Sequence, residues 1–272
     1  MSDEVLDVFK RQLAYVKAPL NARVESTDAS NADWVREKIS FDAGYELGRV
    51  SAFVFLPRNA RPPYQLVVFF PPLPAFVSRA SSDQLQPGMF DFVVKSGRAL
   101  VWPIYKGSYD RWDSFLSLRG DEYLRTFRTR MFQWRHDLGA VLDVMAARPD
   151  IDHRGVAYLG FSFGASTALP LLALEDRLTA AVLVAPGFRY QLLPPEADAV
   201  NYVPHVKIPV LMLGGRHDYV MPLEESQKPL YRLLGTPPDR KRHVVFDAGH
   251  FNFPRSEMIR EALAWLDTYL TP

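Results

Sequence analysis

Apolar residues are spaced along the chain in two patterns, one typical of helices and the other typical of strands. Residues 5–17 carry apolar side chains at helical spacing and predict a short amphipathic helix, and an irregular stretch follows it. Residues 38–42 and 49–56 then predict two β-strands joined by a turn at Ala43-Gly44. Continuous apolar runs come next, typical of strands buried on both faces, at residues 65–70, 99–104, 155–159, 180–184, 209–213 and 243–246.

Helical patterns separate these runs, at residues 124–147, 165–174, 223–234 and 256–270. Strands that alternate with helices after an antiparallel start predict an α/β fold. We expect a mostly parallel, doubly wound sheet with an antiparallel N-terminal edge and flanking helices. Because the 272 residues contain no linker, we expect a single domain over 1–272, with 1–37 packed on it as a helix and an irregular segment.

One short motif carries the strongest chemical signal. The sequence GFSFG at 160–164 follows an apolar run directly and precedes the small residues of 165–168. In a nucleophile elbow a strand turns sharply into a helix, and small residues two places before and after the serine allow the turn that exposes its hydroxyl. Ser162 is therefore the candidate nucleophile. A glycine-rich turn with an incidental serine is the competing interpretation, but the strand and helix around the motif favour the elbow.

A nucleophilic serine needs a histidine base, and the histidine needs a carboxylate that holds its tautomer. In this fold the order along the chain is serine, acid, histidine. Asp218 and His250 each follow an apolar run, so both should emerge at the carboxyl end of a strand, where ligands bind. Asp247 is the competing acid, but it precedes His250 too closely to approach it from a neighbouring strand. His217 is interpreted as a solvated loop residue.

The oxyanion hole is expected to use two backbone N–H groups. One belongs to Phe163, directly after the nucleophile, and the other should come from the loop at 71–76. Proline has no N–H, which leaves Leu73 as the first choice in that loop and Ala75 as the second. Aromatic residues that follow the strands predict a largely apolar pocket, although each could equally be core; the candidates are Phe76, Tyr105, Phe161, Phe188, Tyr219 and Phe251.

The segment 107–131 is rich in arginine and is open to several interpretations. It could form a partial lid or an oligomer contact, but a solvated helical excursion is the favoured interpretation. Lys106 and Arg111 could supply positive charge near the pocket, or lie on an exposed loop.

Composition narrows the function classes. Lys plus Arg (32) nearly balances Asp plus Glu (31), so we expect no nucleic-acid partner. The absence of cysteine excludes disulfides, thiolate metal sites and a cysteine nucleophile. Neither His136 nor His153 has the neighbours of a metal site, and we expect no metal. The polar residues 1–12 and the lack of a long apolar stretch lead us to expect a cytoplasmic protein without a membrane span. The oligomeric state stays open, a homodimer included.

The chain resembles α/β-hydrolases of the dienelactone hydrolase and acetylxylan esterase type. More narrowly, it is similar to the esterase-like domains at the C-terminal end of some bacterial serine/threonine protein kinases. The stretches that carry the resemblance are PLNARVE at 19–25, ISFDA at 39–43, PIYKG at 103–107, LLGTP at 233–237 and RHVVFD at 242–247 with Gly249-His250.

The resemblance implies a bacterial serine esterase with Ser162 as nucleophile, Asp218 as acid and His250 as base. The chain departs from dienelactone hydrolases proper, whose nucleophile is cysteine, and it has Pro72 where glycine is expected before the oxyanion-hole residue. We expect hydrolysis of a small-molecule carboxylic ester through an acyl-enzyme, with short acyl groups or small aromatic esters preferred and no cofactor required. The alternatives are acyl transfer or amide cleavage by the same residues, or a non-catalytic ligand-binding or regulatory module.

Overall fold

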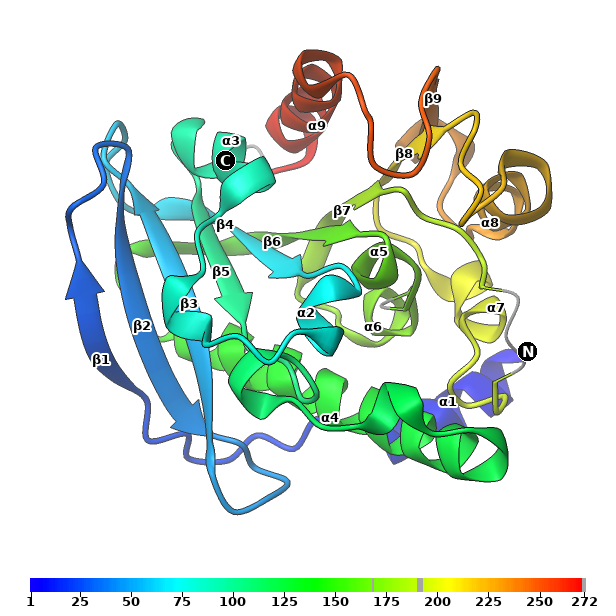
Figure 1. The fold of residues 1–272 in the computed structure, drawn as a ribbon, viewed down its shortest axis with the longest axis horizontal. Coiled ribbons are helices and arrows are strands. Elements are labelled where there is room, and N and C mark those ends of the chain that lie inside the picture. The colour runs from blue at the N-terminus through cyan, green and yellow to red at the C-terminus, as the bar shows by residue number, and fades with distance from the viewer. Residues whose placement is uncertain (168, 190–192, 271–272) are drawn as a thin grey trace. The chain divides into compact units, whose positions relative to one another are not determined.

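The computed structural model in Figure 1 describes residues 1–167, 169–189 and 193–270. The chain divides into two compact units. One, called the C-terminal unit, comprises Met1–Asp7, Phe70–Leu73 and Val156–Pro272. The other, called the N-terminal unit, comprises Val8–Phe69 and Pro74–Gly155. The expectation of a single domain stays a prediction.

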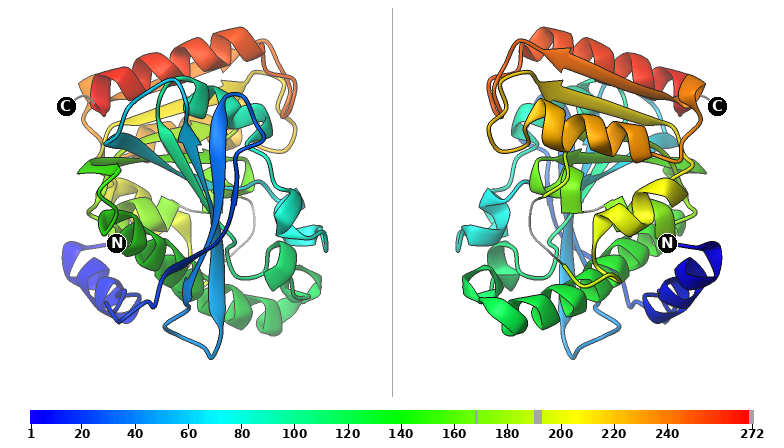
Figure 2. Two further views of the ribbon diagram at one scale, coloured as in Figure 1. Left: turned by 90° about the vertical axis from the view of Figure 1, so that its left-hand side faces the viewer. Right: turned by 90° about the vertical axis from the view of Figure 1, so that its right-hand side faces the viewer.

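The N-terminal unit is built on strands that Figure 2 shows as a strongly twisted ribbon in blue and cyan. In spatial order they are β1 (Arg23–Asp28), β2 (Trp34–Asp42), β3 (Arg49–Pro57), β5 (Ala99–Pro103) and β4 (Tyr64–Phe70), of which β4 reaches into the other unit with its last residue. Neighbours from β1 to β5 are antiparallel, whereas β4 and β5 are parallel. The apolar residues of β3, β4 and β5 are almost completely buried, which is why their sequences read as continuous apolar runs.

The irregular segment predicted within 1–37 is wrong in part, because it contains β1 and the start of β2. Strand β1 is exposed along nearly its whole length, so its sequence RVESTD has no buried face and no apolar alternation to reveal it. The first helix, α1 (Asp3–Gln12), ends earlier than predicted. Beyond it, Tyr15 packs its ring against Gly139, and its hydroxyl donates to Asp143 at 2.9 Å, which draws the chain away from the helical path.

Helices of the N-terminal unit include one long element, α4 (Gly120–Ala146), which packs on β2 and β5. Its buried stripe contains large aromatic residues, among them the completely buried Trp134. The shorter helices are α2 (Pro74–Val77) and α3 (Asp91–Lys95), with short 3-10 turns at Ser82–Gln84, Gly88–Phe90, Tyr109–Arg111 and Phe115–Ser117.

The C-terminal unit contains parallel strands in the order β6 (Ile151–Phe161, from Val156 on), β7 (Leu178–Val184), β8 (Val210–Gly215) and β9 (Lys241–Phe246). Around them lie α5 (Phe163–Thr167), α6 (Leu169–Leu174), α7 (Ala199–Tyr202), a π-helical turn (Leu223–Gln227), α8 (Lys228–Leu233) and α9 (Arg255–Tyr269). Helix α9 packs along β7 and β8, as Figure 2 shows in red. Short 3-10 turns occupy Val203–His205 and Pro238–Arg240.

The strands predicted from apolar runs are confirmed, and so is a mostly parallel sheet with flanking helices and an antiparallel N-terminal edge. Of the helix predicted at 165–174, residue 168 lies outside the described residues. The helix predicted at 223–234 begins as a π turn. Within the described residues, no helix is both long and apolar enough to cross a membrane.

Candidate active site

Ser162 stands in a sharp turn between β6 and α5. Its backbone lies in the left-handed region, with φ at +51°, which is unusual for a residue with a side chain. The turn is held on both sides, because the Ser162 N–H donates to the Val184 carbonyl at 2.8 Å and the Ser162 carbonyl accepts from the Ser166 N–H at 2.9 Å. This is the backbone geometry that the elbow motif predicts.

The two glycines of the motif are needed because the backbone around them is crowded. A Cβ on Gly160 would lie 2.8 Å from the Gly164 carbonyl carbon, and one on Gly164 would clash with the carbonyl oxygen of Phe70. The Tyr158 hydroxyl donates a buried hydrogen bond to the Gly164 carbonyl at 2.7 Å. Sequence reasoning missed this tyrosine, which looks like an ordinary apolar strand residue.

Three buried side chains meet beside this turn. The Ser162 Oγ lies 2.7 Å from Nε2 of His250, and Nδ1 of His250 lies 2.7 Å from Oδ2 of Asp218. As a carboxylate, Asp218 can only accept, so the proton of a neutral His250 belongs on Nδ1. Nε2 then carries the lone pair that accepts the serine hydroxyl. The geometry can therefore remove a proton from Ser162.

The carboxylate of Asp218 is fixed by its own loop. Its Oδ1 accepts from the backbone N–H groups of Val220 and Met221, both at 2.8 Å, which leaves Oδ2 directed at His250. Asp218 and His250 are both at least 97% buried. Water therefore competes little for the bond between them.

The loops that carry the acid and the base also contact each other. Arg216 donates its N–H to the Phe246 carbonyl at 2.8 Å, and His217 donates its N–H to the Ala248 carbonyl at 3.0 Å. The His217 ring is exposed, as predicted, but it pairs with Asp247 at 2.8 Å between Nε2 and Oδ1. The competing acid, Asp247, is thus paired with His217, whereas the carboxylate that contacts His250 belongs to Asp218.

Both predicted oxyanion-hole residues, Phe163 and Leu73, belong to the same unit as the elbow, and Phe163 directly follows Ser162. Phe163 is buried and begins α5, and the Arg189 guanidinium carbon lies 5.3 Å from the centroid of its ring. Leu73 follows β4 and is exposed. The role of their N–H groups stays a prediction.

The predicted pocket aromatics fall into two groups. In the C-terminal unit, the Phe251 ring stands perpendicular to His250 at 4.6 Å between centroids, and Phe161 lies 6.1 Å from the same ring. Phe251 and Tyr219 are 59% and 79% exposed, and Phe188 is half-buried. In the N-terminal unit Phe76 and Tyr105 are buried core residues. Their part in a pocket stays a prediction.

The interpretation of the arginine-rich segment 107–131 as a solvated helical excursion is wrong in part, because Arg111 and Arg130 are largely buried. The Arg111 side chain is only 11% exposed and donates to the completely buried Asp137 at 2.7 Å, as well as to Ile104 O and the Tyr45 hydroxyl. Asp137 also accepts from the Tyr45 hydroxyl and the Lys106 N–H, both at 2.8 Å. Burial and Asp137 raise the pKa of the Tyr45 hydroxyl, so it stays a donor.

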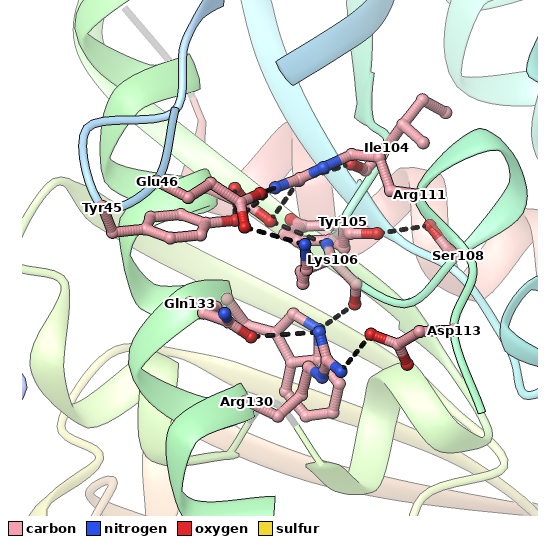
Figure 3. A network of polar contacts seen from close by, with 12 residues as sticks. Tyr45, Glu46, Ile104, Tyr105, Lys106, Ser108, Arg111, Asp113, Arg130 and Gln133 are labelled. Carbon is pink, nitrogen blue, oxygen red and sulfur yellow. Dashed lines mark hydrogen bonds and ion pairs between the residues drawn. The ribbon is translucent and has the colours of Figure 1, made fainter. Parts of the chain in front are cut away.

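Figure 3 shows this polar network, in which Glu46 reaches both Lys106, at 2.8 Å, and Arg111, at 3.1 Å. The buried Arg130 forms a second ion pair, at 2.6 Å, with Asp113, whose side chain is 38% exposed. Lys106 and Arg111 are therefore committed to carboxylates rather than free to lend their charge elsewhere. The described residues hold no group of three or more His, Asp or Glu side chains suited to a metal ion.

Residues 98–264 match the dienelactone hydrolase family, and this span includes Ser162, Asp218 and His250. The chain belongs to the dienelactone hydrolase family. It is also 27% identical over 153 residues to the uncharacterized protein YfhR of Escherichia coli, in strains K12 and O157:H7. This match covers 48% of the chain and 53% of YfhR, so the chain spans about half the length of these relatives.

Solved structures show the same fold over nearly the whole chain. An acetyl xylan esterase from Paenibacillus sp. R4 aligns with a TM-score of 0.71 at 16% identity, covering 98% of this chain and 92% of its own. Acetyl xylan esterase 1 from Thermoanaerobacterium sp. JW/SL YS485 aligns with a TM-score of 0.72 at 16% identity, covering 97% of this chain and 93% of its own. A cold-adapted esterase from an Arctic intertidal metagenomic library aligns with a TM-score of 0.65 at 20% identity, covering 90% of this chain and 100% of its own.

Membership of the dienelactone hydrolase family and the shared fold confirm the α/β-hydrolase fold that the sequence predicts, whereas ester hydrolysis by this chain stays a prediction. This chain of the family has serine at the elbow and no cysteine anywhere. The narrower resemblance to kinase-linked domains stays a prediction.

Proposed function

We propose that the protein hydrolyses carboxylic esters through Ser162, His250 and Asp218, with a covalent acyl-enzyme intermediate. One observation carries the proposal: two consecutive 2.7 Å hydrogen bonds join the serine to the histidine and the histidine to the carboxylate. They start from a serine in the backbone conformation of a nucleophile elbow. The arrangement supplies a nucleophile, a base and a group that fixes the base.

The chemistry follows from the proton positions. Nε2 of His250 takes the proton of Ser162 while Oγ attacks the ester carbonyl, and Asp218 stabilises the imidazolium that forms. The N–H groups of Phe163 and Leu73 are the proposed donors to the oxyanion. The alcohol leaves with the proton from His250. Water, deprotonated by the same nitrogen, then attacks the acyl-enzyme, and the proton returns from His250 to Oγ as the acid is released and the serine is regenerated.

Short-acyl or small aromatic esters are the proposed substrates. The aromatic rings of Phe161 and Phe251 beside His250 favour an apolar group next to the reacting carbonyl. Two of the structural relatives are named as acetyl xylan esterases, which is consistent with a short acyl group.

The test is hydrolysis of p-nitrophenyl esters from acetyl to octanoyl by the wild type, Ser162→Ala and Ser166→Ala. Ser166 is a matched control, since it is a buried serine one turn after the elbow. We expect Ser162→Ala to lose at least about 10⁴-fold in kcat, as nucleophile removal does in serine hydrolases. A fluorophosphonate probe should label the wild type and Ser166→Ala but not Ser162→Ala.

Wild-type turnover by Ser162→Ala would show that the mechanism is wrong. No hydrolysis and no labelling of the wild type would instead favour a ligand-binding module. Ester formation with an added alcohol in excess of acid release would identify acyl transfer as the main reaction.

A further inference from the structure

Asp218 lies in a loop whose two ends are close together. This acid loop, defined as residues 215–221, leaves β8 at Gly215 and reaches the π turn after Met221. The Met221 N–H donates to Oδ1 of Asp218 at 2.8 Å. The position of Met221 therefore decides where the carboxylate of Asp218 points.

Gln227 ties both ends of the acid loop with one amide group. Its side chain is completely buried, and Nε2 donates to the Gly215 carbonyl at 2.9 Å and to the Met221 carbonyl at 2.7 Å. These two bonds use both hydrogens of the amide. A single side chain thus joins the first and the last residue of the loop that carries Asp218.

The remaining atom of the amide is also held. Oε1 of Gln227 lies 3.1 Å from Nε2 of His243 on β9, so His243 donates to it. Burial, together with the charge of Lys228, lowers the pKa of His243 to about 4, which keeps the ring neutral near pH 7. Both N–H groups and the oxygen of the Gln227 amide are consequently hydrogen-bonded, and its orientation is fixed.

Two features of the backbone make room for this amide. Gln227 ends the π turn Leu223–Gln227, and its N–H donates five residues back to the Pro222 carbonyl at 3.2 Å. Single π turns occur often at functional sites. On the opposite side, a Cβ on Gly214 would clash with Oε1 of Gln227. A glycine at position 214 is what allows the amide to sit against the end of β8.

We propose that Gln227 is a positioning residue for ester hydrolysis, which clamps the acid loop so that Asp218 meets His250. The role rests on the proposed function, because it acts through the carboxylate that orients the base. Without the clamp, Gly215 and Met221 would each lose a buried donor, and the loop would shift. Displacement of a catalytic group by about 1 Å can lower a rate by about 100-fold.

The test compares Gln227→Met, which keeps the volume but cannot donate, in the wild-type and Asp218→Ala backgrounds. We expect Gln227→Met to lower kcat by about 10- to 100-fold, with KM within about threefold of the wild-type value. In the Asp218→Ala background the same change should lower kcat less than about twofold, because the group through which Gln227 acts is gone. Fluorophosphonate titration of active sites puts all values on a common scale.

Thr236→Val is the matched control. Thr236 is also buried, and its hydroxyl lies within hydrogen-bonding distance of two backbone carbonyls, those of Val206 and Ile208, in the same unit. It should lower the melting temperature without lowering kcat. If Gln227→Met fails to fold, Gly214→Ala displaces the same amide from the other side and should lower kcat in the same background-dependent way.

Wild-type kcat in Gln227→Met, or an equal loss in both backgrounds, would overturn the proposal. The downfield proton resonance of His250 Nδ1–H gives a readout independent of substrate, and Gln227→Met should shift or broaden it. If the wild type neither hydrolyses esters nor reacts with the probe, the proposed function fails. An unchanged resonance, by contrast, refutes only the role of Gln227.

Discussion

Replacing Asp137 tests the polar network of the N-terminal unit. Its carboxylate is completely buried and accepts three hydrogen bonds, from the Tyr45 hydroxyl, the Lys106 N–H and the Arg111 guanidinium. Asp137→Asn keeps the shape but removes the charge, which leaves Arg111 uncompensated on that side. Removal of one partner of a buried ion pair costs about 3–5 kcal/mol. We expect the lower part of that range, since Arg111 keeps Glu46 at 3.1 Å.

Equilibrium unfolding in urea, followed by tryptophan fluorescence, measures this loss. Four of the five tryptophans belong to the N-terminal unit, so the signal reports mainly on it. Urea is preferred to guanidinium because a salt would screen the ion pair. A loss of about 3–5 kcal/mol corresponds to roughly 6–20 °C in melting temperature for a chain of about this size.

The matched control is Asp143→Asn on the same helix. Asp143 accepts from the Tyr15 hydroxyl and lies 3.9 Å from the exposed Lys17, so we expect a loss of about 1 kcal/mol. The double change Asp137→Leu with Arg111→Met should cost less than the sum of the two single changes, because no unpaired buried charge remains. Stability of Asp137→Asn within about 1 kcal/mol of the wild type would refute the reasoning.

Three further outcomes are expected. Gly164→Ala should lower both the melting temperature and ester hydrolysis, because its Cβ meets the Phe70 carbonyl; an unchanged variant would show that the elbow tolerates side chains there. Burial and the charge of Lys228 lower the pKa of His243 from 6.5 to about 4, so the unfolded chain binds more protons than the folded chain between these two pH values. The stability that the neutral ring contributes is therefore complete above pH 6.5 and is lost as the pH falls toward 4. When the pH is lowered from 6.5 to 4, the midpoint of urea unfolding should therefore fall less for His243→Gln than for the wild type. His217→Ala should change kcat/KM less than about twofold, since its pair with Asp247 is exposed; a larger loss in steady-state assays would contradict this.

The proposed catalytic residues could be found from the sequence because each obeys a local rule. Ser162 lies between an apolar run and small residues. Asp218 follows the fully buried strand β8, and His250 follows β9, which is only partly buried but ends in the apolar residues VVF. Parallel strands then bring their carboxyl ends to one edge, so short-range patterns sufficed to predict a long-range arrangement.

Other features could not be predicted because their partners are distant and polar. Gln227 is an isolated amide in a helical pattern, and its proposed role depends on a π turn and on carbonyls six and twelve residues away. Asp137 and Arg111 are separated by 26 residues, with no apolar periodicity to connect them. The doublet Gly214-Gly215 at the end of β8 is the one signal in the sequence, since glycines in a strand indicate close approach by other groups.

The conformation of Ser162 has a consequence for how the chain tolerates change. A side chain in the left-handed region costs about 1–2 kcal/mol relative to glycine, so selection for stability alone would favour glycine at the elbow. On the proposed mechanism, stability and chemistry oppose each other at this residue. Ser162→Gly should then fold at least as well as the native chain but lose ester hydrolysis, and the strained serine would be retained for its reactivity alone.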